Sequence, residues 1–330
     1  MAKIKSLGSD KILKYGLHLA ILAGVAYAAV KYLNGEELLH ALQSFHYGYA
    51  PFILLFSTSS LLLKAWRFVV LMKPFATGVP GQVTLKAYIA GQAVTLLPGG
   101  IVARAGLMKQ VNIPVAKSGV PIAFSSIFDQ SLFILGSLGA ALWFEAAQLP
   151  ALILLGVITA VTLIALIPTT RQALARAADW LATRLRVADK WHTFLESVPR
   201  VLTWRLMGTS FLLTLLAFVG KILALDLSLR GLELNLGLPT VILGFILPTM
   251  LGRLLPIPGG VGVTEASMVG FLASTTQANV NQLAAAVAIF RLATVFFQAM
   301  LGAAVYFILW DGPKELNRES PSQTVAQEKA

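Results

Sequence analysis

The chain has 330 residues, of which 57% are hydrophobic and only 12% charged, and its mean hydropathy is +0.76. A soluble domain carries roughly 25% charged residues, so this composition excludes a soluble enzyme and indicates an integral membrane protein. The 26 Lys and Arg residues exceed the 15 Asp and Glu residues, which gives a net charge of +11. In a membrane protein this excess indicates basic cytoplasmic loops and anionic lipid rather than nucleic acid.

Apolar stretches long enough to cross a bilayer as helices occur six times. The first follows a basic start and contains Ala26-Tyr27-Ala28, which is similar to a signal cleavage site, but its length favours an uncleaved helix. The six predicted crossings are residues 15–33, 50–72, 120–144, 149–168, 206–229 and 283–310.

Two further apolar segments, 86–108 and 239–272, are interrupted by proline and glycine. A continuous lipid-facing helix tolerates such residues poorly, because proline removes a backbone hydrogen bond. We therefore predict two broken helices or re-entrant hairpins. Their elbows comprise Pro98, Gly99 and Gly100 in the first segment, and Pro256, Pro258, Gly259, Gly260 and Gly262 in the second.

The distribution of Lys and Arg predicts one topology, because these residues concentrate in cytoplasmic loops. Residues 34–49 carry two acids and no Lys or Arg, which places them outside, whereas the loop at 169–205 is strongly basic and lies inside. The first hairpin then enters from the cytoplasm and the second from outside. This predicts a multi-pass protein of the cell inner membrane with both termini in the cytoplasm.

The predicted fold is an all-α polytopic membrane protein with a single transmembrane domain at 1–310 and a disordered tail at 311–330. Its halves, about 50–148 and 206–310, each run crossing, hairpin, crossing, and the second is inverted in the membrane. Inverted repeats with broken helices are typical of transporters that bind substrate near the bilayer midplane. Packing kinks without a binding role remain an alternative.

The basic loop contains an amphipathic pattern, since Leu174, Ala178, Leu181 and Leu185 fall on one helical stripe. We predict a short helix that lies on the membrane surface. An ordinary connector and a docking site for a partner or lipid are both compatible with this pattern.

Charged residues inside the apolar segments are the most informative feature of the sequence. Each costs roughly 2.5–3.5 kcal/mol at a helix centre, so they cannot all face lipid. The cations are Lys64, Arg67, Arg104, Lys221, Arg253 and Arg291, and the acids are Asp129, Asp226 and Glu265.

Several of these charges have competing interpretations. Lys64 and Arg67 share a face near a helix end and would snorkel easily, while Asp226 lies near the outer end of its crossing. Asp129 and Arg291 are flanked on both sides by long apolar stretches. They form either a buried ion pair that fixes the bundle, or a charged site for a lipid headgroup or a coupling proton.

At the second elbow, the glycines permit a tight turn and Thr264-Glu265 opens the next half-helix. A helix N-terminus inside the membrane attracts phosphate or carboxylate. Glu265 is then either a first-turn acid that complements the helix dipole or part of a binding site. Arg253 would hold Glu265 or a lipid phosphate.

Residues 254–266, which read LLPIPGGVGVTEA, resemble the hallmark of the lysylphosphatidylglycerol synthase transmembrane-region family. The likeness extends to Arg291-Leu292 and Phe128-Asp129, and more loosely to Trp66-Arg67 and the first elbow through Arg104. Thr264 departs from the family, which often has Arg there. The first hairpin also lacks an acid, and Ser125-Ser126 replace an acidic-basic pair.

The resemblance implies an inner-membrane protein that translocates polar lipids between leaflets. Its partners would be membrane lipids of anionic phospholipid, glycolipid or hopanoid type, and a lipid-synthesis enzyme or a second copy of the chain. Too few residues follow Asp311 for a soluble aminoacyl-transferase domain, so we expect no synthesis of the aminoacyl lipid.

Our leading hypothesis is a flippase-like translocase that is not an enzyme and that holds a headgroup between the two inverted hairpins. The chain has no cysteine, its four histidines lack metal-ligand spacing, and no nucleotide-binding loop is present, so we expect no metal, cofactor or catalytic residue. A membrane-embedded glycosyl or headgroup transferase and a scaffold of a lipid-synthesis complex are the rival hypotheses. The predicted substrate-binding residues are Arg67, Arg104, Asp129, Lys221, Arg253, Glu265 and Arg291.

Overall fold

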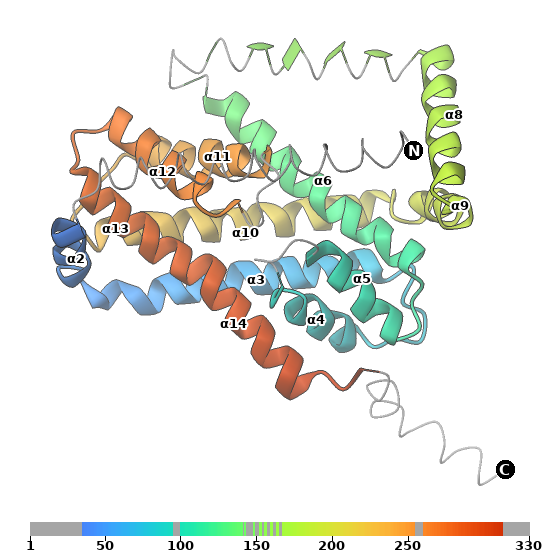
Figure 1. Cartoon of the computed structure of the whole chain (residues 1–330), viewed down its shortest axis with the longest axis horizontal. Helices are drawn as coiled ribbons and strands as arrows, with labels where there is room; N and C mark the ends of the chain where they lie inside the picture. Colours follow the sequence, from blue (N-terminus) through green and yellow to red (C-terminus); the bar gives the residue numbers. More distant parts are fainter. Residues whose placement is uncertain are drawn as a thin grey trace, which may run out of the picture. The chain divides into compact units, whose positions relative to one another are not determined.

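A computed structural model of the chain describes residues 35–94, 100–140, 167–254 and 260–312, with scattered positions between 142 and 164. Every regular element in these ranges is a helix, which confirms the predicted all-α class (Figure 1). In chain order the α-helices are α2 (Gly35–Gln43), α3 (Ala50–Met72), α4 (Gly81–Ala90), α5 (Gly100–Gln110), α6 (Val115–Ala140), α8 (Pro168–Arg184), α9 (Ala188–Ser197), α10 (Trp204–Arg230), α11 (Leu238–Leu254), α12 (Val263–Thr275), α13 (Val280–Arg291) and α14 (Phe297–Ala304).

Four helices in the described part are long and apolar enough to cross a membrane, so the chain is a multi-pass membrane protein. They match four of the six predicted crossings. The predicted crossing at 15–33 lies outside the described residues and that at 149–168 lies mostly outside them. The four spans are Tyr47–Met72, Val115–Gly139, Trp204–Arg230 and Val280–Leu309.

Both predicted interruptions separate a pair of short helices. α4 and α5 contact each other, as do α11 and α12. α11 is the longest of these four helices, with 17 residues. Its length of about 26 Å is less than the roughly 30 Å thickness of the hydrocarbon core. Among the predicted elbow residues, Pro98, Gly99, Pro256, Pro258 and Gly259 lie outside the described residues. Entry and exit on the same face of the membrane stays a prediction for both pairs.

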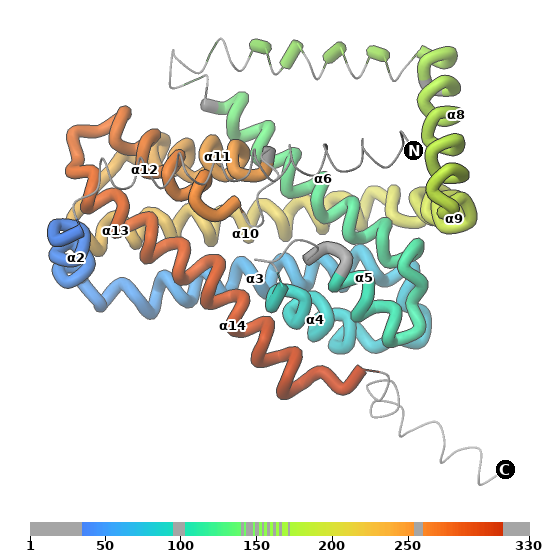
Figure 2. The backbone as a smooth tube through the Cα atoms, viewed as in Figure 1, coloured from blue at the N-terminus to red at the C-terminus, as the bar shows by residue number. Residues whose placement is uncertain are grey.

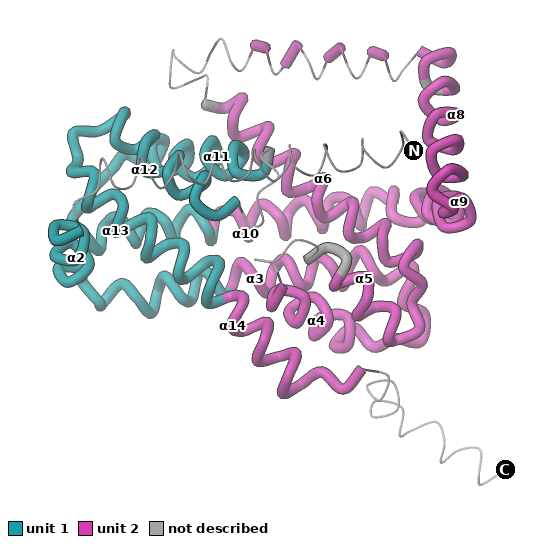
Figure 3. Tube along the Cα trace, viewed as in Figure 1, with its two compact units in different colours: residues 1–58, 96–98, 220–297 teal, residues 59–95, 99–219, 298–330 magenta. Residues whose placement is uncertain are grey.

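Contacts between residues divide the chain into two compact units (Figure 3). Unit 1 spans residues 1–58, 96–98 and 220–297, and unit 2 spans residues 59–95, 99–219 and 298–330. α3 and α10 contribute residues to both units. The predicted sequence halves, 50–148 and 206–310, stay predictions.

The core of unit 2 is formed by α3, α4, α5 and α6. Phe68, Tyr88, Met108 and Phe128 belong to one continuous buried apolar cluster contributed by these helices. α14 also packs closely within this unit. A Cβ atom added to its Gly302 would lie 2.6 Å from the backbone nitrogen of Ala93.

The basic loop contains α8, which confirms the predicted helix there. The predicted stripe is largely uncovered, since Leu174, Leu181 and Leu185 are all exposed. α9 is tied to α8 by a hydrogen bond of 2.9 Å from Trp191 Nε1 to Asp179 Oδ1. An exposed apolar stripe on a basic helix is typical of a helix that lies on a membrane surface.

Unit 1 has α2 at the end where α3 and α13 begin (Figure 2). α11 and α12 approach closely, because a Cβ atom added to Gly244 would lie 2.7 Å from Cδ2 of Leu272. Phe245 of α11 packs edge-on against Phe290 of α13, with ring centroids 6.0 Å apart. These contacts join α11, α12 and α13 into one layer of helices.

We predict that Gly302→Ala destabilises the protein, because the new methyl group would meet the backbone of Ala93 and Ile89. Overpacking of this kind costs about 1–3 kcal/mol. Gly270→Ala is the matched control, since nothing lies within 4 Å of a Cβ atom at that helical glycine. Thermal unfolding of the purified protein in detergent measures both. Equal unfolding midpoints for the two variants would contradict the close approach at Gly302.

Candidate functional site

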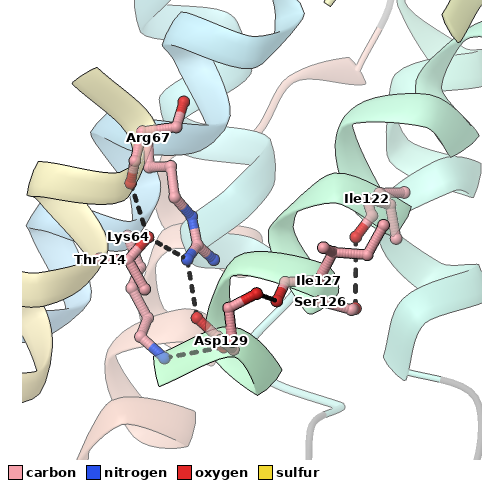
Figure 4. Close-up of polar contacts among 9 residues, drawn as sticks. Lys64, Arg67, Ile122, Ser126, Ile127, Asp129 and Thr214 are labelled. Atoms are coloured by element: carbon pink, nitrogen blue, oxygen red, sulfur yellow. Dashed lines mark hydrogen bonds and ion pairs between the residues drawn. The ribbon is translucent and has the colours of Figure 1, made fainter. Parts of the chain in front are cut away.

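Asp129 on α6 is the centre of a charged network inside the membrane-crossing helices of unit 2 (Figure 4). Its Oδ1 accepts a hydrogen bond of 2.7 Å from Arg67 Nη1, and its Oδ2 accepts one of 3.0 Å from Lys64 Nζ. Arg67 Nη1 also donates to Thr214 Oγ1 on α10 over 2.8 Å. The Arg67 side chain is 2% exposed, so it does not snorkel to water as its position near a helix end suggested.

The charged members of the network are two cations, Lys64 and Arg67, and one anion, Asp129. Its surroundings also hold polar atoms without a partner in the described residues: Nε of Arg67 and Oγ of Ser60, Ser125 and Ser210. Each serine precedes a network residue by four positions and so lies one turn away on the same helix face. Buried polar atoms in folded proteins are normally satisfied by protein, water or ligand.

Glu265 and Arg291 form the second charged contact, within unit 1. Glu265 Oε2 accepts a hydrogen bond of 2.6 Å from the backbone N–H of Gly262, and its Oε1 accepts one of 2.5 Å from Arg291 Nε. Glu265 therefore acts both as a first-turn cap of α12 and as the partner of Arg291. Arg253, the other candidate partner, is exposed at the end of α11.

The described part of the second elbow requires glycine. Gly260 and Gly262 have φ angles of +61° and +87°, a region that glycine adopts without strain. A Cβ atom at Gly252 would lie 2.0 Å from Thr264 Oγ1, so α11 and α12 touch here through a glycine and a threonine. Thr264 is buried at this contact.

Arg291 is the last α-helical residue before a π-helical turn, η4 (Leu292–Phe296). Such wide turns leave backbone carbonyls in need of other donors and are frequent at functional sites. Here Ser57 Oγ of α3 donates to the carbonyl of Ala293 over 2.6 Å. The sequence analysis did not identify Ser57 or Thr214. The only feature of the sequence that could have identified Ser57 and Thr214 is that they are small polar residues within apolar helices.

The remaining predicted site residues are not members of the ion pairs described above. Arg104 is half-buried on α5, with its guanidinium carbon 4.4 Å from the ring centroid of Tyr88. Lys221 is half-buried on α10, and Asp226 forms an i,i+4 pair with Arg230 over 2.7 Å. Substrate binding by Arg104, Lys221 and Arg253 stays a prediction. No group of three or more His, Asp or Glu residues that would hold a metal ion is found in the described ranges.

A comparison with protein families matches residues 16–302 to the lysylphosphatidylglycerol synthase TM region. The chain belongs to this family. The match spans both charged contacts and both interrupted segments, and it confirms the family resemblance of the elbow motif. A search of the curated proteins gave no match. Membership of the lysylphosphatidylglycerol synthase TM-region family makes this a membrane protein of lipid metabolism or transport.

We predict that Asp129→Asn strongly destabilises the fold, because it removes the buried carboxylate that both Lys64 and Arg67 contact. Loss of one partner from a buried ion pair costs about 3–5 kcal/mol. Asp226→Asn is the control and should cost about 1 kcal/mol or less, since its partner Arg230 is half-exposed. Thermal unfolding midpoints of the two variants in detergent measure the loss of stability. Adding Lys64→Met to Asp129→Asn should recover part of that loss. Similar midpoints for both single variants would show that the Asp129 network is dispensable for stability.

Proposed function

We propose that this protein moves polar lipids between the two leaflets of the cytoplasmic membrane. The observation that carries the proposal is the network of Lys64, Arg67 and Asp129, which brings two cations and one anion together inside membrane-crossing helices. Charged side chains in hydrocarbon are costly and commonly mark the path of a polar substrate. Two cations, together with the buried polar atoms beside them, would attract an anionic headgroup.

The polar atoms around the network suit a phosphodiester group. Lys64 Nζ and Arg67 Nε are donors, and the hydroxyl groups of Ser60 and Ser125 both donate and accept hydrogen bonds. Hydrogen bonds from cations to phosphate are stronger than those between neutral groups. We therefore propose an anionic phospholipid as the substrate, ahead of the glycolipid and hopanoid-type lipids.

We propose the Glu265–Arg291 contact as a second place where a headgroup binds. We propose that both hairpins are re-entrant, because α4, α5, α11 and α12 are all too short to cross the hydrocarbon core. A re-entrant α12 would begin inside the membrane, with its positive end capped by the Glu265 carboxylate, which also pairs with Arg291. The acyl chains would remain in the lipid while the headgroup follows the charged residues.

Translocation of this kind breaks no covalent bond, so the proposal requires neither a catalytic residue nor a cofactor. The driving force would be a gradient of lipid or ions. A lipid-synthesis enzyme that releases its product beside the protein, or a second copy of the chain, is the proposed partner.

Reconstitution into liposomes with a fluorescent phosphatidylglycerol tests the proposal, since a membrane-impermeant reductant bleaches only the outer leaflet. We expect fast bleaching of the inner pool with the wild-type protein. Lys64→Gln should slow it about 10- to 100-fold, because it removes a charged hydrogen bond worth about 1.5–3 kcal/mol. The variant keeps the balanced Arg67–Asp129 pair and should therefore fold.

The matched control for this assay is Lys190→Gln, which removes an exposed charge from α9. It should leave the rate unchanged. Wild-type liposomes that scramble no faster than protein-free ones would refute translocation. A folded Lys64→Gln variant with the wild-type rate would remove the network from the mechanism, and a new lipid species formed from an added donor would favour a transferase instead.

A further inference from the structure

A cavity of about 640 Å³ lies at the end of unit 1 where α3 and α13 begin and α10 ends. It is separate from both ion pairs. Its walls come from α2, from the residues after α10 and from the first turn of α13. The lining residues are Glu37, His40, Ala41, Ser44, His46, Leu232, Glu233, Asn279, Asn281 and Gln282.

Contacts on two sides fix the shape of this cavity. The backbone N–H of His46 donates to the carbonyl of Gly231 over 2.8 Å, and Gly231 lies so close to Phe45 that an added Cβ atom would be 2.1 Å from its ring. On the other side, Asn281 Nδ2 donates to Glu37 Oε2 over 2.5 Å, which joins α13 to α2. The cavity is therefore preformed.

The lining has an unusual charge for this protein. It holds two carboxylates, Glu37 and Glu233, together with amide and imidazole groups, and it includes no Lys or Arg. The chain as a whole has 26 Lys and Arg residues against 15 Asp and Glu residues. Carboxylates repel a phosphate and attract an ammonium group, so the cavity suits a cationic donor of hydrogen bonds.

A second pocket of about 650 Å³ adjoins the first and shares His46 with it. Its lining is mostly aromatic and apolar: Tyr47, Gly48, Tyr49, Phe52, Phe56 and Leu227. Tyr47 and Phe52 are exposed. Aromatic rings at a helix end are typical of the membrane interface, and their faces also attract ammonium groups. Side by side, the two pockets match an amphiphile with a polar end and an apolar end.

We propose that these two pockets form one site for a zwitterionic phospholipid of the phosphatidylethanolamine type. Its ammonium group occupies the cavity between Glu37 and Glu233, and its apolar part lies against the aromatic pocket. The predicted topology places this end of the helices outside, so the site takes lipid from the outer leaflet. The site goes beyond the proposed translocation of anionic lipid, because it uses none of the residues of the Asp129 network.

Native mass spectrometry of the full-length protein, released from phosphatidylglycerol nanodiscs that contain a minor second lipid, tests this site. The second lipid is phosphatidylethanolamine, its N-acetylated form, or a neutral glycolipid with the same acyl chains. We expect the wild-type protein to retain phosphatidylethanolamine about two- to fivefold more than either uncharged headgroup, since Glu233 is largely exposed and exposed charge pairs are weak. Equal retention of the three lipids would overturn the proposal.

Glu233→Gln should abolish the preference for phosphatidylethanolamine. The Glu233 side chain is 82% exposed and contacts His46 Nε2 over 3.2 Å, a pair at the surface on which the fold depends little. Glu196→Gln on α9 removes another exposed carboxylate and should leave the preference intact. An unchanged preference in Glu233→Gln would overturn the assignment of the ammonium group to this cavity.

Free ethanolamine separates a lipid site from a site for a soluble amine. We expect millimolar ethanolamine to leave the retained lipid in place, because it lacks the apolar part that fills the aromatic pocket. Phe52→Ser should weaken retention of the lipid. Displacement of the lipid by free ethanolamine, together with an unaffected Phe52→Ser variant, would overturn the role of the aromatic pocket and identify a soluble amine as the ligand. None of these outcomes depends on the rate of lipid translocation.

Discussion

The cost of charge in hydrocarbon is the constraint on which the arrangement of this protein depends. An ionised side chain that faces acyl chains costs several kcal/mol, whereas a typical fold is stable by roughly 5–15 kcal/mol in total. The described helices meet this constraint by turning their buried charges toward one another. Asp129 draws Lys64 and Arg67 together in unit 2, and Glu265 draws in Arg291 in unit 1. The packing of α3 against α6, and of α12 against α13, follows from these pairs as well as from apolar contacts.

The two charged contacts solve this problem differently. The Glu265–Arg291 pair is balanced and is combined with a helix cap, so it fixes the start of α12 against α13. The Asp129 network holds two cations, and the hydroxyl groups of Ser60, Ser125 and Ser210 near it have no partner among the described residues. A fully hydrogen-bonded pair is a means of holding helices together, whereas a polar network with unsatisfied atoms is a place where water or a ligand completes the structure. This difference explains why the proposed passage of headgroups centres on unit 2.

Hydropathy identified the crossings that the structure describes, because an apolar run near 20 residues has the length of the hydrocarbon core when it is helical. Proline and glycine likewise predicted the breaks between α4 and α5 and between α11 and α12. The partners of the charged residues could not be predicted from the sequence. Asp129 and Arg67 are separated by 62 positions, and hydropathy carries no information on which helix faces meet. Snorkelling of Arg67 was one of two alternatives for that helix taken by itself. It does not occur, because Arg67 is buried and donates to Asp129 of α6 and Thr214 of α10.

The π-helical turn after Arg291 changes which helix face each later residue occupies, so the regular spacing of an α-helix does not predict those faces. A turn of this kind holds one residue more than an α-helical turn, so all side chains beyond it are displaced by about 100° around the axis. Gly302 comes after that turn, and its bare face meets Ile89 and Ala93. A helical wheel that starts at Val280 and assumes 3.6 residues per turn therefore predicts the wrong buried face for α14. Any redesign of this last span must keep the π-helical turn, because the turn determines which side chains of α14 face the rest of the protein.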